Sequence, residues 1–253
     1  MATELSGMVE RRGTGLWLTH VLMIFGVLVV FFPIWLAFVA STVTQADIVR
    51  PPMPLWPGSQ FLANYKAALF SGVNVPVATM LVNSLIMAVG IAVGKIVISL
   101  LSAYAIVYFR FPGKPVFFCL IFPLIASATA TFLFRQFFLT IPDELAEAAR
   151  VDGAGAMRFF WDIVLPMSRT NIAALFVILF IYGWNQYLWP LLITTRPEMN
   201  TIVMGIKQMF PSGDDLADWP VIMATAILAM IPPIFVVVSM QKLFIRGLVD
   251  SEK

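Results

Sequence analysis

The chain has 253 residues, of which 60% are hydrophobic and only 12% are charged. Soluble domains carry about 25% charged residues, so this composition predicts an integral membrane protein with one membrane domain. The net charge of +2 is too small to indicate a nucleic-acid-binding protein, and the single cysteine, Cys119, excludes an intrachain disulfide framework and a cysteine-rich metal site.

The first apolar run, from Leu16 to Ala40, predicts a membrane-spanning helix. It reaches the ~20 residues that a helix needs to cross a bilayer and is longer than the apolar region of a signal peptide. Because Arg11 and Arg12 precede it, we expect an uncleaved first span, about Trp17 to Val39, with the N-terminus in the cytoplasm. Cleavage near Ala40 is the alternative.

A more polar segment follows, from Ser41 to about Val77. Its first half contains four prolines between residues 51 and 57, which prevent a long helix there. The amphipathic patch from Phe61 to Phe70 predicts a short helix at the membrane interface.

The second span runs from about Thr79 to Phe109. A helix of that length measures ~46 Å, more than the ~30 Å hydrocarbon core, so it must tilt or protrude. Gly90 and Gly94 form a small-xxx-small pattern that predicts a close approach of another helix. Arg110 and Lys114 after the span indicate a cytoplasmic loop.

Three further apolar runs predict spans at about Val116 to Phe138, Asn171 to Ile193 and Val221 to Met240. With the N-terminus inside, five spans place the C-terminus outside, whereas Lys242 and Arg246 favour a cytoplasmic tail. An additional crossing between Lys114 and Thr140 would remove this conflict. The predicted fold is therefore an all-α polytopic helical bundle with five recognisable spans and one suspect interval.

The most polar segment lies between the third and fourth runs, and it cannot lie in lipid. Thr140, Pro142 and Asp143 predict a helix start with a threonine cap. Gly153 predicts the end of that helix, because glycine readily adopts positive φ. A second short helix would then place four apolar side chains along one side: Met157, Phe160, Trp161 and Val164.

This segment resembles the coupling loop of the membrane subunits of bacterial binding-protein-dependent ABC importers. The pattern consists of Glu147-Ala-Ala, three residues, Gly153, nine residues, and Ile163-Val-Leu-Pro. The resemblance implies a six-span permease whose cytoplasmic coupling segment, residues 142–166, is held in a cleft of the ATP-hydrolysing subunit. It also implies the coupling residues Glu147, Ala148, Ala149, Asp152 and Gly153. An ordinary solvated helix–turn–helix loop is the alternative.

A second resemblance narrows the type of importer. Gly183 to Pro190 looks like a segment of carbohydrate-type importers. The chain also resembles permeases for sn-glycerol-3-phosphate in five segments: the first span, Asn83 to Pro112, Ser127 to Phe138, the coupling segment and Phe180 to Leu192. The likeness implies import of sn-glycerol-3-phosphate or a related glycerophosphodiester across the bacterial inner membrane.

The same resemblance implies several partners, and it implies that the chemistry lies in one of them. The expected partners are membrane lipid, a dimer of ATP-binding subunits, a second permease subunit and an extracytoplasmic solute-binding protein. The chain itself would be no enzyme and would hold no cofactor, because ATP and Mg²⁺ are bound by the partner ATPase.

The chain departs from this family in one place. Members of the family have a further stretch between the residues that match Phe122 and Pro123, and its absence falls in the interval where the span count fails. Either the protein is a shortened natural variant or its sequence has lost a piece.

Polar side chains within the apolar runs are candidates for the translocation path: Asn83, Ser84, Lys95, Asn185 and Gln186. Hydrogen bonding between helices is an equal alternative for the amides and the hydroxyl. Lys95 is the only basic residue deep in a span, and a cation suits a phosphate-bearing substrate, although direct contact is the less favoured interpretation. With one histidine, His20, and one cysteine, no catalytic or metal site is expected.

Three other functions remain open at this point. A permease for sugars would share the same coupling segment. A secondary transporter would lack it and would show internal repeats or broken half-helices. A defective permease remnant would retain the segment but lack a crossing.

Overall fold

The computed structural model describes residues 14–71, 75–110, 112, 127–210 and 217–250. All regular secondary structure in these residues is helical, which confirms the predicted all-α class. The chain divides into two compact units, residues 1–77 with 208–228 and residues 78–207 with 229–253. We call them unit 1 and unit 2. The expectation of one membrane domain over residues 1–253 stays a prediction.

Unit 1 begins with α1 (Thr14–Ala40), which confirms the first predicted span. The stretch Trp17–Ala40 is long and apolar enough to cross a membrane, and none of its most apolar part is buried in the chain. A helix that is apolar all round and has no protein cover suits a hydrocarbon environment. Pro33 lies inside the helix, as is tolerated in membrane spans.

The polar segment of unit 1 folds into short helices. Helix α2 (Gln45–Val49) starts with a capping box between Thr44 and Asp47, and hydrogen bonds from Thr44 lower the pKa of the Asp47 carboxyl. Helix α3 (Phe61–Lys66) continues into a π-helical turn, η2 (Ala67–Ser71), so the predicted Phe61–Phe70 patch is helical.

The Gln45 side chain ties α2 to the residues that open α14 (Trp219–Asp250). Its amide nitrogen donates to the Ala217 carbonyl (2.7 Å), and its amide oxygen accepts from the Trp219 N–H (3.0 Å). The apolar stretch Trp219–Gln241 of α14 confirms the last predicted span.

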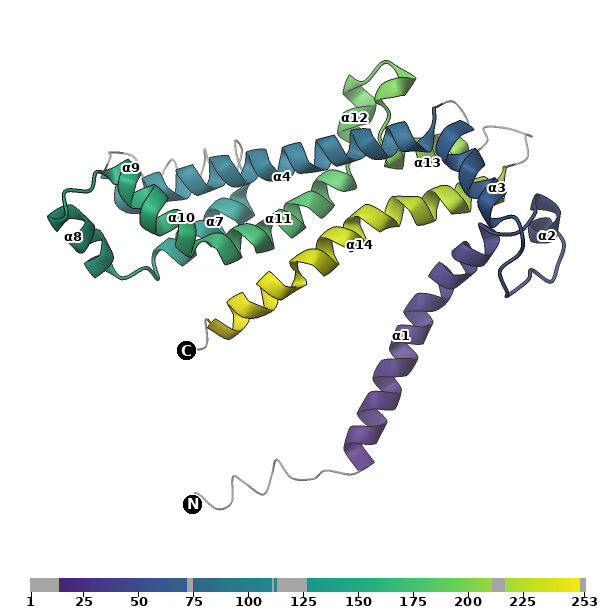
Figure 1. The fold of residues 1–253 in the computed structure, drawn as a ribbon, viewed down its shortest axis with the longest axis horizontal. Helices are drawn as coiled ribbons and strands as arrows, with labels where there is room; N and C mark the ends of the chain where they lie inside the picture. The colour runs from purple at the N-terminus through teal and green to yellow at the C-terminus, as the bar shows by residue number, and fades with distance from the viewer. Residues whose placement is uncertain (1–13, 72–74, 111, 113–126, 211–216, 251–253) are drawn as a thin grey trace. The chain divides into compact units, whose positions relative to one another are not determined.

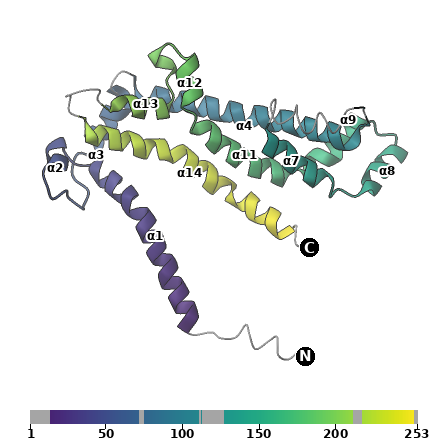
Figure 2. The same ribbon diagram turned by 180° about the vertical axis from the view of Figure 1, so that it is seen from behind.

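Unit 2 is built around α4 (Val77–Tyr108), which confirms the second predicted span. Helices α7 (Ala128–Phe138) and α11 (Arg169–Trp184) lie along it (Figures 1 and 2). A Cβ added at Gly183 of α11 would come within 2.9 Å of the Ala88 Cα of α4, so these two backbones approach closely at Gly183. At Gly90 and Gly94 nothing among the described residues lies within 4 Å of an added Cβ, so the close approach that this pattern permits is not made within the described part of the chain.

The two ends of α4 carry different short helices. Helices α8 (Asp143–Val151) and α9 (Ala156–Phe159) lie near its last turns. Helices α12 (Leu188–Ile193) and α13 (Ile202–Met209) lie near its first turns (Figure 1). A π-helical turn, η4 (Phe160–Val164), and α10 (Leu165–Met167) join α9 to α11, and a 3-10 turn, η5 (Pro197–Met199), precedes α13.

The remaining predicted spans differ from the structure or are only partly described. The helix expected from Asn171 to Ile193 ends at Trp184 and resumes as α12. Pro190 has no N–H to donate to a carbonyl four residues earlier, which helps to explain this interruption. A pair of helical stretches, Ala156–Met167 and Arg169–Trp184, bent by 70°, could instead form one broken span.

Of the run expected from Val116 to Phe138, only the part from Ser127 onwards is described, and it forms α7. The predicted loop at Lys114, the thiol of Cys119, the Phe122–Pro123 junction and the N-terminal Arg11 and Arg12 lie outside the described residues. Three described helices are long and apolar enough to span a membrane, and the bent pair would make four.

Candidate coupling site

The coupling segment, residues 142–166, opens with α8. Asp143 and Glu144 lie in its first turn and Arg150 in its last, so these charges complement the helix dipole. The predicted threonine cap is wrong: the Thr140 hydroxyl donates to the Phe137 carbonyl at 2.6 Å and so belongs to the end of α7. Pro142 occupies the cap position of α8 and makes no side-chain cap bond.

Gly153 ends α8, as predicted, with a φ of +72°. The Ala154 N–H donates to the Ala149 carbonyl (2.8 Å) and the Gly153 N–H donates to the Arg150 carbonyl (3.0 Å). This pair of bonds is a Schellman motif, which requires a left-handed residue at the position of Gly153. The chain can therefore turn sharply here and begin α9 after Gly155.

The second half of the segment, α9 with η4, shows both a buried and an exposed face. Phe159, Phe160 and Val164 are buried, whereas Met157 and Trp161 are 58% and 59% exposed. The four apolar side chains predicted to share one side of this helix therefore do not all pack inward. Phe160 and Val164 do, whereas Met157 and Trp161 face outward. Arg158 and Asp162 form an exposed ion pair at 3.3 Å, and such surface pairs contribute about 1 kcal/mol or less.

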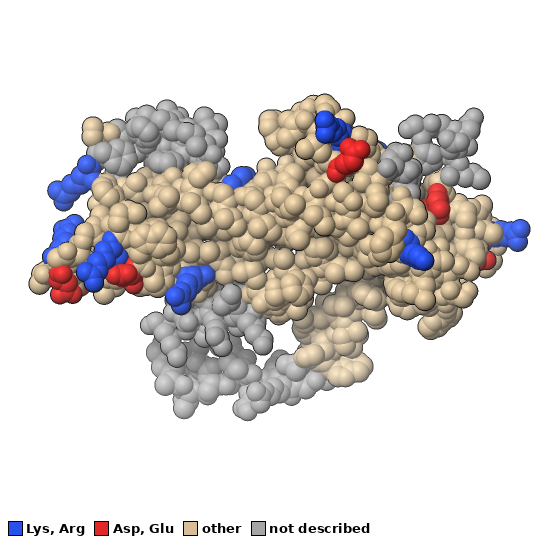
Figure 3. Space-filling model, turned by 45° about the horizontal axis from the view of Figure 1, so that its top comes forward, with Lys and Arg blue, Asp and Glu red and all other residues tan. Residues whose placement is uncertain are grey.

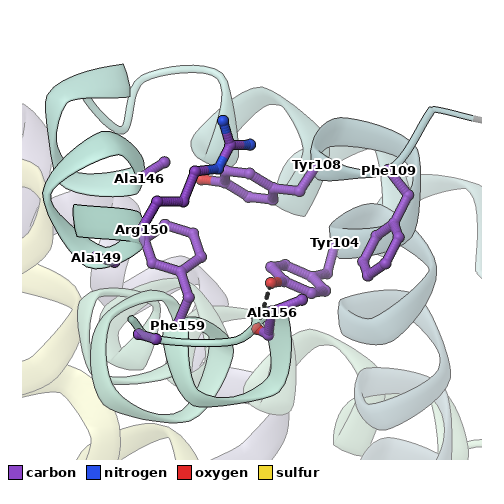
Figure 4. A pocket seen from close by; sticks show the side chains of 9 residues that line it. Tyr104, Tyr108, Phe109, Ala146, Ala149, Arg150, Ala156 and Phe159 are labelled. Carbon is purple, nitrogen blue, oxygen red and sulfur yellow. Dashed lines mark hydrogen bonds between the residues drawn. The ribbon is translucent and has the colours of Figure 1, made fainter. Parts of the chain in front are cut away.

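Aromatic side chains join this second half to α4 and α7. The Tyr104 and Phe160 ring centroids lie 4.9 Å apart. The Tyr108 ring meets Phe159 edge-on at 5.2 Å and Phe138 at 6.3 Å. Pairs of this kind add about 0.5–1.5 kcal/mol each beyond the area that they bury. The Tyr104 hydroxyl also donates to the Ala156 carbonyl at 2.6 Å (Figure 4).

A cavity of about 120 Å³ lies between the end of α4 and the inner side of α8 (Figure 4). Ala146, Ala149 and Arg150 of α8 line it from one side, and Tyr104 and Tyr108 of α4 line it from the other. Small alanines on the inner side of α8 leave this space unfilled. The rings of Phe159 and Phe160 contact α4, whereas this cavity lies between α4 and the alanines of α8.

The predicted coupling residues divide between two faces of the segment. Glu147, Ala148, Asp152 and Gly153 are exposed, whereas Ala149 is 7% exposed and lines the cavity. Val151, which is not among the predicted coupling residues, is 88% exposed. An apolar side chain placed among charged ones on a short amphipathic helix was the signal that could have revealed it.

Charged side chains gather around this segment. Figure 3 shows basic and acidic groups close together at the end of unit 2 that carries α8 and α9, while the long surface beside them has few charges. The arrangement offers a partner a polar surface with apolar side chains among its charges: Val151, Met157 and Trp161. Such a mixed surface suits a protein partner better than lipid.

Two of the predicted path residues hold a loop to the first turns of α4. The Asn83 amide donates to the carbonyls of Glu198 (2.7 Å) and Asn200 (3.0 Å). The buried Ser84 hydroxyl accepts from the Ile202 N–H at 2.8 Å. The sequence left open hydrogen bonding between helices, and the bond to Ile202 at the start of α13 is of that kind, whereas the Asn83 bonds go to the residues before α13. A role in the path stays a prediction.

The other path candidates lie near Tyr182 of α11. The Asn185 amide donates to the Ile181 carbonyl (2.9 Å) and the Gln186 amide donates to the Tyr182 carbonyl (3.3 Å), so both bond within their own chain segment. The Lys95 ammonium lies 4.3 Å from the centre of the Tyr182 ring, a cation–π contact. Lys95 is eleven residues, or ~16 Å along the helix, from Ser84, so the candidates form two groups.

The chain is similar to a known protein family and to named members of it. The family described as binding-protein-dependent transport system inner membrane component matches residues 6–250. The sn-glycerol-3-phosphate transport system permease protein UgpE of Agrobacterium fabrum is 51% identical over 282 residues, covering 97% of this chain and 100% of that protein. The UgpE proteins of Rhizobium meliloti and Yersinia pestis are 50% and 51% identical with the same coverage.

These alignments also reveal a difference in length. Each extends over 282 positions, which is 29 more than the 253 residues of this chain. At least that many positions of the relatives therefore have no counterpart here.

A solved structure shows the same fold. It is a bacterial ABC transporter involved in the import of the acidic polysaccharide alginate, with a TM-score of 0.76 and 20% identity, and the match covers 96% of this chain and 98% of that one. The family match, the relatives and the shared fold agree: this chain belongs to the binding-protein-dependent transport system inner membrane components.

Proposed function

We propose that this chain is a membrane-spanning permease subunit of an ATP-driven importer that moves sn-glycerol-3-phosphate, or a related glycerophosphodiester, inward. The proposed substrate rests on the identity of 50–51% to UgpE proteins over almost the whole chain. The exposed face of α8 supplies the feature that such a subunit needs, which is a polar surface outside the lipid.

The proposed mechanism contains no chemical step in this chain. A dimer of ATP-binding subunits binds ATP and Mg²⁺ and hydrolyses the nucleotide. A second permease subunit completes the path, and an extracytoplasmic solute-binding protein delivers the substrate. The N-terminus and α8 then lie in the cytoplasm of a multi-pass inner-membrane protein. Movement of the ATPase cleft shifts α8, and this shift exposes the path to alternate sides.

Glu147 and Asp152 would form the polar contacts with the ATPase cleft, because both are exposed on α8 and its C-terminal turn. Ala148 permits close approach on the same face, and Gly153 sets the turn. Ala149 has a different part in this proposal, because it faces the cavity and keeps the inner side of α8 small.

Lys95 is the path candidate best suited to the phosphate of the substrate. A cation inside an apolar span is costly unless it faces a partner or a wet cavity, and the Tyr182 ring partly serves as that partner. A phosphate group that entered the path would compete with the ring for this cation, because charge-assisted bonds are stronger than cation–π contacts at exposed sites.

The 29 unmatched positions favour a second candidate. In this candidate the chain is a shortened permease that fails to assemble. Loss of a stretch between Phe122 and Pro123 would remove one crossing and place α8 on the wrong side of the membrane. Insertion of the corresponding stretch of a UgpE relative tests this candidate: a remnant gains uptake from the insertion, whereas a natural short variant is already active.

Reconstituted uptake tests the main proposal. Proteoliposomes that contain this chain, the second permease and the ATPase dimer are supplied with the solute-binding protein and labelled sn-glycerol-3-phosphate. We expect uptake that requires ATP and that excess unlabelled glycerophosphodiester reduces more than a neutral sugar does. Competition by the neutral sugar alone would support a sugar permease. Ion-driven uptake without the ATPase would indicate a secondary transporter.

A further inference from the structure

Two tyrosines one turn apart on α4 differ in what their hydroxyls do. Tyr104 is only 4% exposed, and its hydroxyl donates to the Ala156 carbonyl at 2.6 Å. The Tyr108 hydroxyl is buried as well, but it has no hydrogen-bond partner among the described residues. Both rings pack in the same aromatic cluster, with centroids 5.0 Å apart.

The acceptor of the Tyr104 bond lies at a mechanically important place. Ala156 is the first residue of α9 and follows the left-handed turn at Gly153 by three positions. Its carbonyl belongs to the backbone, so the bond fixes the position of the chain itself relative to α4. Packing of Tyr104 against Phe160 (4.9 Å) supports the same junction from the side.

The first half of the coupling segment lacks such a tight fit. The cavity of about 120 Å³ separates Ala146 and Ala149 of α8 from the two tyrosines. One route from the outer face of α8 to α4 therefore runs through the turn at Gly153 and the start of α9. The Tyr104 hydroxyl is a direct polar link on that route.

We propose that Tyr104 is a positioning residue that fastens the coupling segment to α4, so that movement of α8 is converted into movement of the span. This inference rests on the proposed coupling function. Without the hydroxyl, the ATPase still docks on α8 and hydrolyses ATP, but the start of α9 slips relative to α4 and fewer substrate molecules cross for each ATP.

Tyr104→Phe and Tyr108→Phe form a matched pair for testing this proposal. Each removes one buried hydroxyl and keeps the ring, but only the first breaks a hydrogen bond. Both are assayed in the reconstituted complex for substrate imported and for ATP hydrolysed. We expect the number of substrate molecules imported per ATP to fall about threefold or more in Tyr104→Phe and to stay unchanged in Tyr108→Phe.

The ratio separates positioning from a general loss of structure, because a destabilised complex loses uptake and hydrolysis together. Equal ratios in the two variants would overturn the role of Tyr104 and leave the permease function intact. Absence of ATP-driven uptake in the unsubstituted complex would instead count against the proposed function itself.

Hydrogen exchange provides a second readout that needs no activity. We expect the amides of residues 156–160 to exchange faster in Tyr104→Phe than in Tyr108→Phe, because the carbonyl at the start of α9 has lost its link to α4. Unchanged exchange in Tyr104→Phe would contradict the proposal even if that variant assembled poorly.

Discussion

The first and last turns of α4 are both attached to other parts of unit 2, but the attachments differ in kind. At the first turns, Asn83 and Ser84 make three hydrogen bonds to the backbone before and at the start of α13. At the last turns, aromatic rings and one hydroxyl hold α9, and a cavity separates α4 from α8. Directional bonds to a backbone fix one geometry, whereas a cavity allows a helix to shift. We therefore expect the first end to be rigid and the last end to carry movement.

The largest expected effect comes from the turn that joins the two halves of the coupling segment. Proline cannot adopt the φ of +72° observed at Gly153, so Gly153→Pro should disrupt the Schellman turn. We expect ATP-driven uptake to fall more than about tenfold, a free-energy change of about 1.4 kcal/mol, while membrane insertion is retained. Gly155→Ala is the control, because Gly155 has a φ of −71° and nothing lies within 4 Å of an added Cβ. Uptake at the unsubstituted level by Gly153→Pro would show that the turn is not needed.

Reversal of charge on the exposed face of α8 should have the next largest effect. We expect Glu147→Lys to reduce ATP-driven uptake about fivefold or more. The new lysine would face the basic groups of the ATPase cleft that the Glu147 carboxylate contacts in the proposal, and like charges repel. Glu144→Lys is matched in charge and exposure on the same helix but lies outside the coupling pattern. The ratio of uptake to ATP hydrolysis in the two variants is the measurement, and equal losses would show that the effect is one of general charge.

Lys95 lies between the two ends of α4, and substitutions there test the translocation path rather than the coupling to the ATPase. We expect Lys95→Gln to raise the substrate concentration needed for half-maximal uptake about threefold and Lys95→Arg to restore most of the affinity, because arginine keeps the charge. The rate of ATP hydrolysis at saturating substrate should change little. Similar affinity in Lys95→Gln and the unsubstituted complex would remove Lys95 from the proposed path.

Substitution at the first turns of α4 should have the smallest effect on transport. It should nevertheless change the stability of the complex measurably. Ser84→Ala leaves the buried Ile202 N–H without its acceptor, which costs about 1–3 kcal/mol. Ser99→Ala is the matched control on the same helix, because the Ser99 hydroxyl is also buried but has no hydrogen-bond partner among the described residues. Thermal unfolding of the purified complex compares the two. A loss of stability in Ser99→Ala as large as in Ser84→Ala would contradict the difference between them.

The long spans could be predicted from the sequence because apolar length is a local property. Helices α1, α4 and α14 follow their apolar runs closely. The end of α8 could also be predicted, since Gly153 is a local signal for a left-handed turn. Helix interruptions were harder: α11 ends at Trp184, and the Asn185 and Gln186 amides bond to carbonyls one turn earlier. Their place in the translocation path stays a prediction.

The attachments of α4 could not be predicted from local pattern. Tyr104 and Ala156 are 52 residues apart in the chain, and Asn83 and Asn200 are 117 apart. Periodicity and capping rules describe neighbours within about one turn, so they carry no information on such pairs. The burial of Ala149, which the family resemblance includes among the coupling residues, is a second example, because the cavity that it lines is formed by residues of α4 and α8 together.

The central claim is that the exposed face of α8 binds the ATPase subunit, and cysteine cross-linking measures this contact directly. In a Cys119→Ser background, Val151→Cys places a thiol on a side chain that is 88% exposed on α8, and Trp189→Cys places one at a position that is 62% exposed on α12. With a short thiol-to-amine cross-linker in the assembled complex, we expect the ATPase to be captured from position 151 and not from position 189. Capture from position 189 instead, or from neither position in a complex that hydrolyses ATP and imports substrate, would contradict the account.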